Sequence, residues 1–553
     1  MDTPANLRIV IVGGVAGGAS AAARARRINA TAEITILEKG PAVSFANCGL
    51  PYHIGGEIAD RNKLLVATPE LFWNRFRISV KTHHEAVRID REQQVVHVRA
   101  TSPEGNIQEL AFPYDRLILA PGAEPVRPPF AEPRPRNAFQ LWTLPDMDNV
   151  LAYLKHHPVK RVMVVGAGFV GLEVVEQFHR LGIQVDLVER NPQILTRMDP
   201  IFAKMVARVI ESHSVRILTG VSVESLEFEN DTAIAARLSN GDHVETDLVL
   251  MGIGVRPRTA LAASAGLTIG SAGGISVNEF LQTSDPNIYA VGDCIEYTYG
   301  VTGEKGLNPL AGAANRAGRI AGQHAASGDA EMMGPVFGTS IVRVFDCTAA
   351  MTGMSEKQLT QRGIAFRTAI IQATNHASYF PGASNMHLKL LYDDPSGQIF
   401  GAQAVGGEGV DKRIDIIATA MQLGGTVYDL AKIDLAYAPP YGSAKDPVHI
   451  AAFVAINDLQ HTPRLTLPNT DLSGLQVVDV RTEKERQQLP LPGAIPIGVD
   501  ELPTRWTELD PNRKTVVVCH SGKRSHVGAS RLVSSGFKDV LNLTGGMSIR
   551  SLT

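Results

Sequence analysis

Residues 7–18 read LRIVIVGGVAGG, an apolar β-branched run that leads directly into a glycine-rich loop. Such a run is typical of a strand buried inside a parallel sheet. Residues 19–28 continue as a helix of mostly small side chains, and a second apolar run at 33–37 ends at Glu38. Strand, loop, helix, strand and terminal acid in this order predict a dinucleotide-binding βαβ unit.

The loop of this unit has the features that bind a dinucleotide. Its glycines allow a tight turn and close packing, the helix amides face a pyrophosphate, and the acid accepts ribose hydroxyls. Valine replaces glycine at the middle position of the G-x-G-x-x-G fingerprint, which is a departure from the pattern. The expected nucleotide contacts are Gly13, Val15, Ala16, Gly18 and Glu38.

The same unit occurs a second time. Residues 161–165 predict a strand, residues 166–171 read GAGFVG with all three glycines, and the strand at 185–188 ends at Glu189. One chain therefore carries two dinucleotide sites. The carboxylate of Glu189 should repel a 2′-phosphate, which favours NADH over NADPH, although Arg190 beside it weakens this preference. The second set of expected contacts is Gly166, Gly168, Gly171 and Glu189.

Other segments complete a multidomain pattern. Residues 114–123 and 248–254 predict strands that end in glycine-containing turns. A third strand at 287–293 ends in Asp293, and a carboxylate in that position suits sugar or ribityl hydroxyls. From about residue 334 short strands and helices predict an α+β domain, and the polar residues after 458 predict a linker.

Residues 44–52 read SFANCGLPY and place a lone cysteine, Cys48, after the first nucleotide unit. Flavin reductases with paired cysteines carry a second thiol about five residues further on. Residues 49–53 contain no cysteine, so we expect Cys48 to react alone with a sulfur or an oxygen of the substrate. The plainer alternative is a buried structural cysteine.

A small α/β unit with a second distinctive cysteine follows the linker. Residues 477–481 and 515–518 predict strands, and residues 519–525 read CHSGKRS, a loop that opens a helix. A thiol at a helix N-terminus within a basic loop lies where thiolate is stabilised. Consecutive loop amides can also hold an anionic sulfur or an oxyanion, so Cys519 is a second candidate nucleophile.

Composition excludes several classes of protein. The 553 residues, 44% hydrophobic and 20% charged, are typical of a soluble enzyme with several domains. A net charge of -3 leaves no basic footprint for nucleic acid. The four cysteines lack metal-ligand or disulfide spacing, so no metal is expected. The apolar N-terminal run has no basic start and no segment is long enough to span a bilayer, which predicts a cytoplasmic protein without a membrane partner.

Residues 7–457 resemble the pyridine nucleotide–disulfide oxidoreductases through the two βαβ units, APGA at 120–123 and VGD at 291–293. The resemblance implies that the first unit binds FAD, that the second binds NAD(P)H, and that the third domain forms a homodimer. Further cofactor contacts implied by the resemblance are Ala120, Gly122, Gly292, Asp293 and Ala311 for FAD, and Gly252 and Gly254 for NADH.

The single-cysteine segment is similar to that of coenzyme A-disulfide reductases, NADH oxidases and NADH peroxidases. The oxidases and peroxidases carry a histidine in the first glycine loop, and this chain has none, so it resembles the coenzyme A-disulfide reductases. By that resemblance Tyr379 and Tyr437 of the partner subunit are catalytic, with Tyr441 as a rival for the second. The residues implied to contact coenzyme A are Arg27, Ser44, Asn47, Asn375 and Lys445.

The tail resembles a rhodanese domain through DVR at 479–481, PGAI at 492–495, the CHSGKRS loop and GGM at 545–547. The predicted fold is therefore α/β, with two Rossmann-like domains of the glutathione reductase type followed by an α+β domain and the rhodanese domain. The expected boundaries are FAD-binding at 1–150 and 251–333, NAD-binding at 151–250, dimerisation at 334–457, a linker at 458–465, and rhodanese at 466–553.

These resemblances predict a homodimeric flavoenzyme that reduces sulfur–sulfur bonds. NADH reduces FAD, the electron pair passes to Cys48, and Cys519 carries persulfide sulfur to the flavin site. Coenzyme A disulfide, coenzyme A persulfide and polysulfide are not ranked as substrates. Two alternatives stay open, namely reduction of peroxide or oxygen through a Cys48 sulfenate and sulfur transfer from Cys519 to a protein acceptor.

Overall fold

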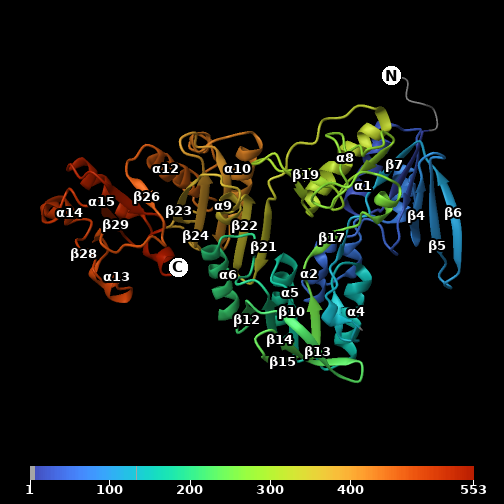
Figure 1. Ribbon diagram of the computed structural model, residues 1–553, viewed down its shortest axis with the longest axis horizontal. Helices are drawn as coiled ribbons and strands as arrows, with labels where there is room; N and C mark the ends of the chain where they lie inside the picture. Colours follow the sequence, from blue (N-terminus) through green and yellow to red (C-terminus); the bar gives the residue numbers. More distant parts are fainter. Residues whose placement is uncertain (1–6, 133) are drawn as a thin grey trace. The chain divides into compact units, whose positions relative to one another are not determined.

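The computed structural model describes residues 7–132 and 134–553 (Figure 1). Two compact units divide the chain. The first comprises Met1–Pro192 with Val215–Gly338, and the second comprises Gln193–Ser214 with Thr339–Thr553. Among the described residues, no helix has both the length and the apolar character that crossing a membrane requires.

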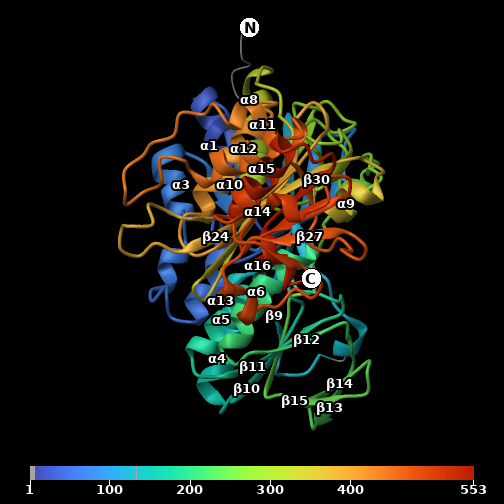
Figure 2. The same ribbon diagram turned by 90° about the vertical axis from the view of Figure 1, so that its left-hand side faces the viewer.

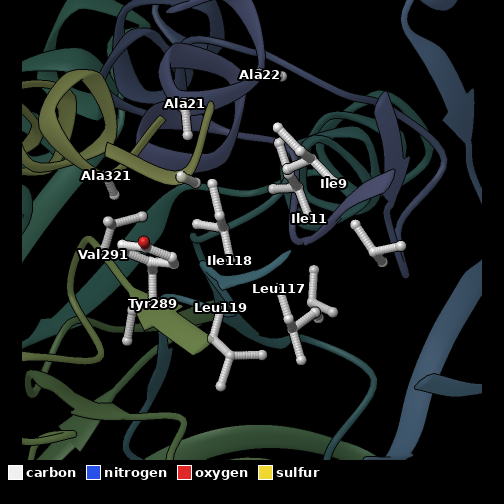
Figure 3. Close-up of a cluster of buried hydrophobic side chains, with 14 of the residues drawn as sticks. Ile9, Ile11, Ala21, Ala22, Leu117, Ile118, Leu119, Tyr289, Val291 and Ala321 are labelled. Carbon is white, nitrogen blue, oxygen red and sulfur yellow. The ribbon is translucent and has the colours of Figure 1, made fainter. Parts of the chain in front are cut away.

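The first unit contains a five-stranded parallel sheet in the order β18-β7-β1-β2-β3. Its strands are β18 (Ile288–Ala290), β7 (Arg116–Leu119), β1 (Arg8–Val12), β2 (Glu33–Leu37) and β3 (Ser79–Lys81). Figure 3 shows Ile9, Ile11 and Ile118 in the core of this sheet. Apolar residues run continuously along β1 and β7 because helices and loops bury both faces of the strands.

Helices α1 (Ala16–Ile28) and α8 (Ala311–Ser327) pack together over this sheet. Their small residues are needed because the backbones nearly touch. A Cβ on Gly318 would lie 2.2 Å from the carbonyl oxygen of Gly17, and one on Gly322 would lie 2.3 Å from that of Ala21. This close packing fixes α1, and with it the first glycine loop, against the sheet.

A second parallel sheet in the same unit has the order β12-β11-β10-β16-β9. Its strands are β12 (Arg216–Thr219), β11 (Gln184–Glu189), β10 (Arg161–Val165), β16 (Leu248–Met251) and β9 (Ala138–Gln140). Helix α5 (Phe169–Arg180) packs on β10 and β11. The unit also contains two antiparallel three-stranded sheets: β4 (His84–Asp90), β5 (Val95–Thr101) and β6 (Ile107–Pro113), and β13 (Val223–Glu229), β14 (Thr232–Leu238) and β15 (His243–Glu245).

The second unit begins with an antiparallel sheet in the order β21-β22-β25-β24-β23. Its strands are β21 (Ser340–Val344), β22 (Cys347–Gly353), β25 (Ile399–Gly406), β24 (Asn385–Tyr392) and β23 (Arg367–Thr374). Helices α10 (Val410–Gln422) and α12 (Pro447–Leu459) pack against its strands. Helix α6 (Pro200–Ser212) also belongs to this unit, because the buried Lys389 ammonium on β24 lies 2.7 Å from the Asp199 carboxylate that precedes α6.

A parallel sheet in the order β26-β30-β29-β27-β28 forms the C-terminal domain, with helices α15 (Lys523–Ser534) and α16 (Gly546–Arg550) (Figure 2). Its strands are β26 (Arg464–Thr466), β30 (Val540–Leu543), β29 (Thr515–Val518), β27 (Gln476–Asp479) and β28 (Ile495–Pro496). Two Rossmann-like sheets, an α+β domain and a terminal α/β domain are all present, so the predicted fold class is confirmed.

The segment 458–465, which the sequence predicts to be a linker, is held by side-chain contacts at both ends. Asp458 lies in the last turn of α12. Its fully buried carboxylate forms an ion pair with Arg367 on β23 and accepts a 2.8 Å hydrogen bond from the Tyr392 hydroxyl. It also accepts a 2.7 Å bond from the Leu465 amide, where β26 starts. Because these bonds join both sides of the segment, the C-terminal domain is anchored to the α+β domain.

Candidate functional site

The first glycine loop is shaped by close backbone contacts. Gly13 has φ +91°, and a Cβ there would lie 2.2 Å from the carbonyl oxygen of Ala120. A Cβ on Gly18 would lie 1.9 Å from the carbonyl oxygen of Gly13. Glu38 accepts hydrogen bonds from the amides of Gly14 at 2.8 Å and Gly40 at 2.7 Å. Val15 ends this loop as the residue before α1, and Ala16 is the first residue of that helix.

The second loop repeats these contacts and leaves its middle glycine open. A Cβ on Gly166 would lie 2.5 Å from the carbonyl oxygen of Gly252, and one on Gly171 would lie 2.0 Å from that of Gly166. In contrast, a Cβ on Gly168 would meet no atom within 4 Å. Glu189 is buried and accepts a 2.9 Å hydrogen bond from the Ala167 amide. An open glycine next to a helix N-terminus fits the close approach of a pyrophosphate.

The remaining predicted cofactor residues lie beyond the carboxyl ends of the parallel strands. Three of them, Gly122, Gly254 and Gly292, have φ values of +69°, +105° and +87°, a left-handed conformation that glycine adopts without strain. Asp293 follows β18, and burial raises the pKa of its carboxyl to about 6. Ala120 follows β7, Gly252 follows β16 and Ala311 begins α8. Glycine turns and an acid after the ends of parallel strands are features that fit a dinucleotide in each of the two sheets.

Cys48 lies in the short helix Asn47–Gly49, which runs into α2 (Leu50–Ile54). Its thiol is exposed and donates a weak hydrogen bond of 3.6 Å to the side-chain oxygen of Asn47. Enough protein surrounds the sulfur that desolvation raises the pKa of the Cys48 thiol, and the carboxylates of Glu173 and Asp293 raise it further. The chain alone therefore favours the protonated thiol over the thiolate that nucleophilic attack requires.

Glu173 is a residue near this thiol that sequence reasoning missed. It lies on α5, directly after the second glycine loop, and accepts a 3.1 Å hydrogen bond from the Tyr52 hydroxyl of α2. The two helices are also closely packed, since a Cβ on Gly55 would lie 1.9 Å from the side-chain oxygen of Gln177. The helix α2, which directly follows the short helix of Cys48, therefore packs on α5 of the second nucleotide unit.

Three predicted substrate residues lie in the first unit. Arg27 is exposed at the end of α1, with its guanidinium 5.5 Å from the centre of the Phe76 ring. Ser44 has φ +48°, and its amide donates a 2.8 Å hydrogen bond to the Gly14 carbonyl. Asn47 is the neighbour of Cys48 already described. Ser44 thus ties the segment that carries Cys48 to the first glycine loop.

The second unit brings the two predicted catalytic tyrosines together. The hydroxyl oxygens of Tyr379 and Tyr437 lie 3.3 Å apart, although Tyr379 is 75% exposed and Tyr437 is 50% exposed. This hydrogen bond raises the pKa of the Tyr379 phenol, so the phenol stays protonated at neutral pH. Tyr441, the rival for the second tyrosine, is also exposed.

Asn375 and Lys445, the other predicted substrate residues, are placed differently from each other. Asn375 is buried, and its side-chain oxygen accepts hydrogen bonds of 3.0 Å from the amides of His376 and Ser384. That oxygen shapes the loop that presents Tyr379. Lys445 is exposed and follows the segment that carries Tyr437 and Tyr441.

Cys519 is buried at the end of β29, inside the loop that precedes α15. Its sulfur accepts a 3.1 Å hydrogen bond from the Gly522 amide and a 3.2 Å hydrogen bond from the Ser525 hydroxyl. Arg524 forms an ion pair with Glu485. This pairing holds the pKa of the Glu485 carboxyl at about 2 and compensates the charge of the arginine. The loop is thus less basic than its sequence suggests, and the donors to the sulfur are an amide and a hydroxyl.

The other two cysteines have no such surroundings. Cys294 and Cys347 are buried, and burial raises the pKa of each thiol to about 12. Both stay protonated at neutral pH, as buried cysteines without a chemical role do.

Three family models match the chain. Residues 7–324 match the model described as pyridine nucleotide-disulphide oxidoreductase, residues 339–447 match the dimerisation domain of that family, and residues 467–548 match the rhodanese-like domain. The first match covers more than half of the chain.

Individual relatives resemble nearly the whole chain. A coenzyme A disulfide reductase of Staphylococcus aureus is 36% identical over 450 residues, which cover 81% of this chain and 99% of that protein. The crystal structure of reduced Bacillus anthracis CoADR-RHD is 38% identical, with a TM-score of 0.95 over 100% of this chain and 99% of that one. A NAD-dependent persulfide reductase from A. fulgidus is 34% identical, with a TM-score of 0.90 over 98% of this chain and 100% of that one. The chain is an oxidoreductase that belongs to the pyridine nucleotide-disulphide oxidoreductase family.

Proposed function

We propose that this chain acts as a homodimeric, NADH-dependent flavoenzyme that reduces the sulfur–sulfur bond of coenzyme A disulfide, coenzyme A persulfide or polysulfide. The observation that carries the proposal is the exposed Cys48, which stands alone beside two dinucleotide-type glycine loops. An exposed thiol without a nearby partner suits reaction with a sulfur that the substrate brings. The similarity to a coenzyme A disulfide reductase and to a persulfide reductase supports the same substrate class.

The residues of the glycine loops would hold both cofactors. FAD would lie on the loop from Gly13 to Gly18 with its ribityl hydroxyls toward Asp293, and NADH would lie on the loop from Gly166 to Gly171. When bound, the two cofactors supply the electron pair that reopens the oxidised form of Cys48.

Cys48 supplies the nucleophile of the proposed reaction. Its thiolate attacks one sulfur of the substrate, so that a bond between Cys48 and that sulfur forms while the substrate's sulfur–sulfur bond breaks. With coenzyme A disulfide this leaves a mixed disulfide on Cys48 and one departing coenzyme A thiolate. The raised pKa of Cys48 means that the attack becomes faster as the pH rises toward that pKa.

Tyr379 and Tyr437 of the partner subunit would serve the departing sulfur. Tyr379 keeps its proton because the hydrogen bond from the pair raises its pKa, and it would donate that proton to the leaving thiolate. Tyr437, 3.3 Å away, would orient the Tyr379 hydroxyl. Both are exposed in the single chain, as residues that complete a site on a second subunit would be.

Cys519 would capture sulfur for this site. It attacks the outer sulfur of a persulfide or polysulfide, the donor's sulfur–sulfur bond breaks, and Cys519 becomes a persulfide. The thiolate of coenzyme A then attacks that outer sulfur, which restores Cys519 and yields coenzyme A persulfide as the substrate of Cys48. The two donors at the Cys519 sulfur would stabilise its anionic form.

The rate of NADH consumption tests this proposal directly. We expect turnover with coenzyme A disulfide, coenzyme A persulfide or polysulfide, and much slower turnover with peroxide or oxygen. NADPH should give a lower kcat/KM than NADH because of the Glu189 carboxylate. Fast reduction of peroxide with no reduction of the three sulfur substrates would contradict the proposed function.

A further inference from the structure

The C-terminal segment 544–548 holds the loop around Cys519 by backbone hydrogen bonds. The amide of Met547 donates a 2.8 Å hydrogen bond to the carbonyl oxygen of Cys519, and the amide of Ser548 donates a 2.9 Å bond to that of His520. A Cβ on Gly546 would lie 2.6 Å from the first of these oxygens and 2.5 Å from the second. These contacts fix the peptide groups at the start of the loop.

The same segment is attached to the α+β domain through one side chain. The buried Thr544 hydroxyl accepts a 2.7 Å hydrogen bond from the Ile370 amide and donates a 3.1 Å bond to the Ile370 carbonyl. Ile370 lies on β23, the outer strand of its sheet, so these backbone groups face away from β24. Thr544 therefore satisfies an edge strand that would otherwise bury two unpaired polar groups.

The neighbouring glycine reinforces this attachment. Gly545 has φ +70°, and a Cβ there would lie 3.1 Å from the Cγ2 atom of Ile370. The amide of Thr544 itself donates a 3.0 Å hydrogen bond to Thr466, at the end of β26. The segment is thus held between β23 on one side and the Cys519 loop on the other.

We propose that Thr544 is a positioning residue for the Cys519 thiol. By holding residues 544–548 on β23, it sets the Cys519 sulfur against the Gly522 amide and the Ser525 hydroxyl. The Gly522 amide lies 3.1 Å and the Ser525 hydroxyl 3.2 Å from the sulfur, so both hydrogen bonds depend on where the loop places Cys519. This inference rests on the proposed function, in which Cys519 reacts as an anion.

The contact of Thr544 with β23 also has a consequence for the reactivity of Cys519. Strand β23 ends at Thr374, directly before the loop that carries Asn375 and Tyr379. The strand that receives Thr544 therefore leads into the predicted tyrosine site. The position of the sulfur-carrying loop depends on a strand of another domain, and its reactivity should respond to changes at that contact.

The test uses the full-length chain with Cys48→Ser, so that Cys519 is the remaining cysteine with a candidate reactive role. Thr544→Val keeps the shape of the side chain and removes the hydroxyl, whereas Thr544→Ser keeps the hydroxyl. The rate of alkylation by iodoacetamide is measured as a function of pH, with the modified cysteine identified by mass. Sulfur transfer from thiosulfate to cyanide is measured in parallel.

We expect Thr544→Val to move the pH profile of Cys519 alkylation to higher pH and to lower the kcat for sulfur transfer about tenfold. Thr544→Ser should restore both. If Thr544→Val does not fold, Thr544→Ala removes the hydroxyl without placing a new methyl against the Ile370 peptide and gives the same comparison. Folding is judged by bound flavin and, with Cys48 intact, by reduction of coenzyme A disulfide.

The outcomes separate this inference from the proposed function. A folded Thr544→Val or Thr544→Ala chain with the wild-type alkylation profile would overturn the positioning role, as would a serine variant that behaves like the valine variant. Absence of sulfur transfer in the wild-type chain would instead contradict the carrier role of Cys519. The alkylation profile would still decide the role of Thr544.

Discussion

Cys48 is exposed, and desolvation together with two nearby carboxylates raises its pKa, whereas Cys519 is buried and its sulfur accepts two hydrogen bonds. Cys48 lies in the short helix Asn47–Gly49, which runs into α2, and α2 packs against α5. Cys519 lies in a loop that residues 544–548 hold by hydrogen bonds. An exposed thiol can receive a large disulfide, while a buried thiol with donors directed at its sulfur suits a small anionic sulfur group. This difference supports the proposal that the two cysteines react with different substrates.

The strongest test of this comparison is Cys48→Ser. We expect NADH-dependent reduction of coenzyme A disulfide to fall by more than about 10³-fold, because no other described cysteine lies near the nucleotide loops in an exposed position. Flavin absorbance should remain, since the side chain is not among the predicted FAD contacts. Turnover near the wild-type rate would mean that the thiol is not the nucleophile.

Cys519→Ser is the matched variant in the other site. Sulfur transfer from thiosulfate should be abolished and turnover with polysulfide should fall, while reduction of coenzyme A disulfide should stay within about twofold of wild type. The reason is that a soluble disulfide reaches Cys48 without capture by the C-terminal domain. An equal loss of all three activities would indicate structural damage. No change in any of them would contradict the proposed role of Cys519.

Tyr379→Phe should have the next largest effect, and only on the Cys48 reaction. Loss of the proton donor should slow disulfide reduction about 10²-fold, with sulfur transfer by Cys519 unchanged as an internal control. A heterodimer of one Cys48→Ser chain and one chain with both Tyr379→Phe and Tyr437→Phe should regain activity, because one complete site is restored. An inactive heterodimer of proven stability would argue that each site is built within one chain.

Glu173→Gln should produce the smallest effect. Its negative charge raises the pKa of Cys48, so removal of the charge should lower that pKa and move the pH profile of Cys48 alkylation to lower pH. Tyr52→Phe is the control, since it removes the hydrogen bond to Glu173 and leaves the charge in place. The profile of Cys519 should not move in either variant. A shift to higher pH in Glu173→Gln would contradict the electrostatic assignment.

The segment 458–465 illustrates the limit of composition as a guide to mobility. Polar residues and prolines favour a flexible connection, yet Asp458 is buried against Arg367 and Tyr392. A carboxylate loses its solvation in such a place only when partners from other strands compensate it. Those partners lie far away in the sequence, and no local pattern identifies them.

The sequence by itself determined the two nucleotide-binding units, the α+β domain, the terminal α/β domain and the solitary Cys48. These features follow from local patterns, because strand, glycine loop, helix and terminal acid occur within one short stretch of chain. Only the tertiary structure decided that Glu173 lies near Cys48 and that the hydroxyls of Tyr379 and Tyr437 form a hydrogen bond. It also decided that Glu485 forms an ion pair with Arg524, and that Thr544 binds the edge of β23. Each of these depends on the packing of segments that are distant in sequence, and the direction of a side chain across such a contact leaves no mark in the local pattern.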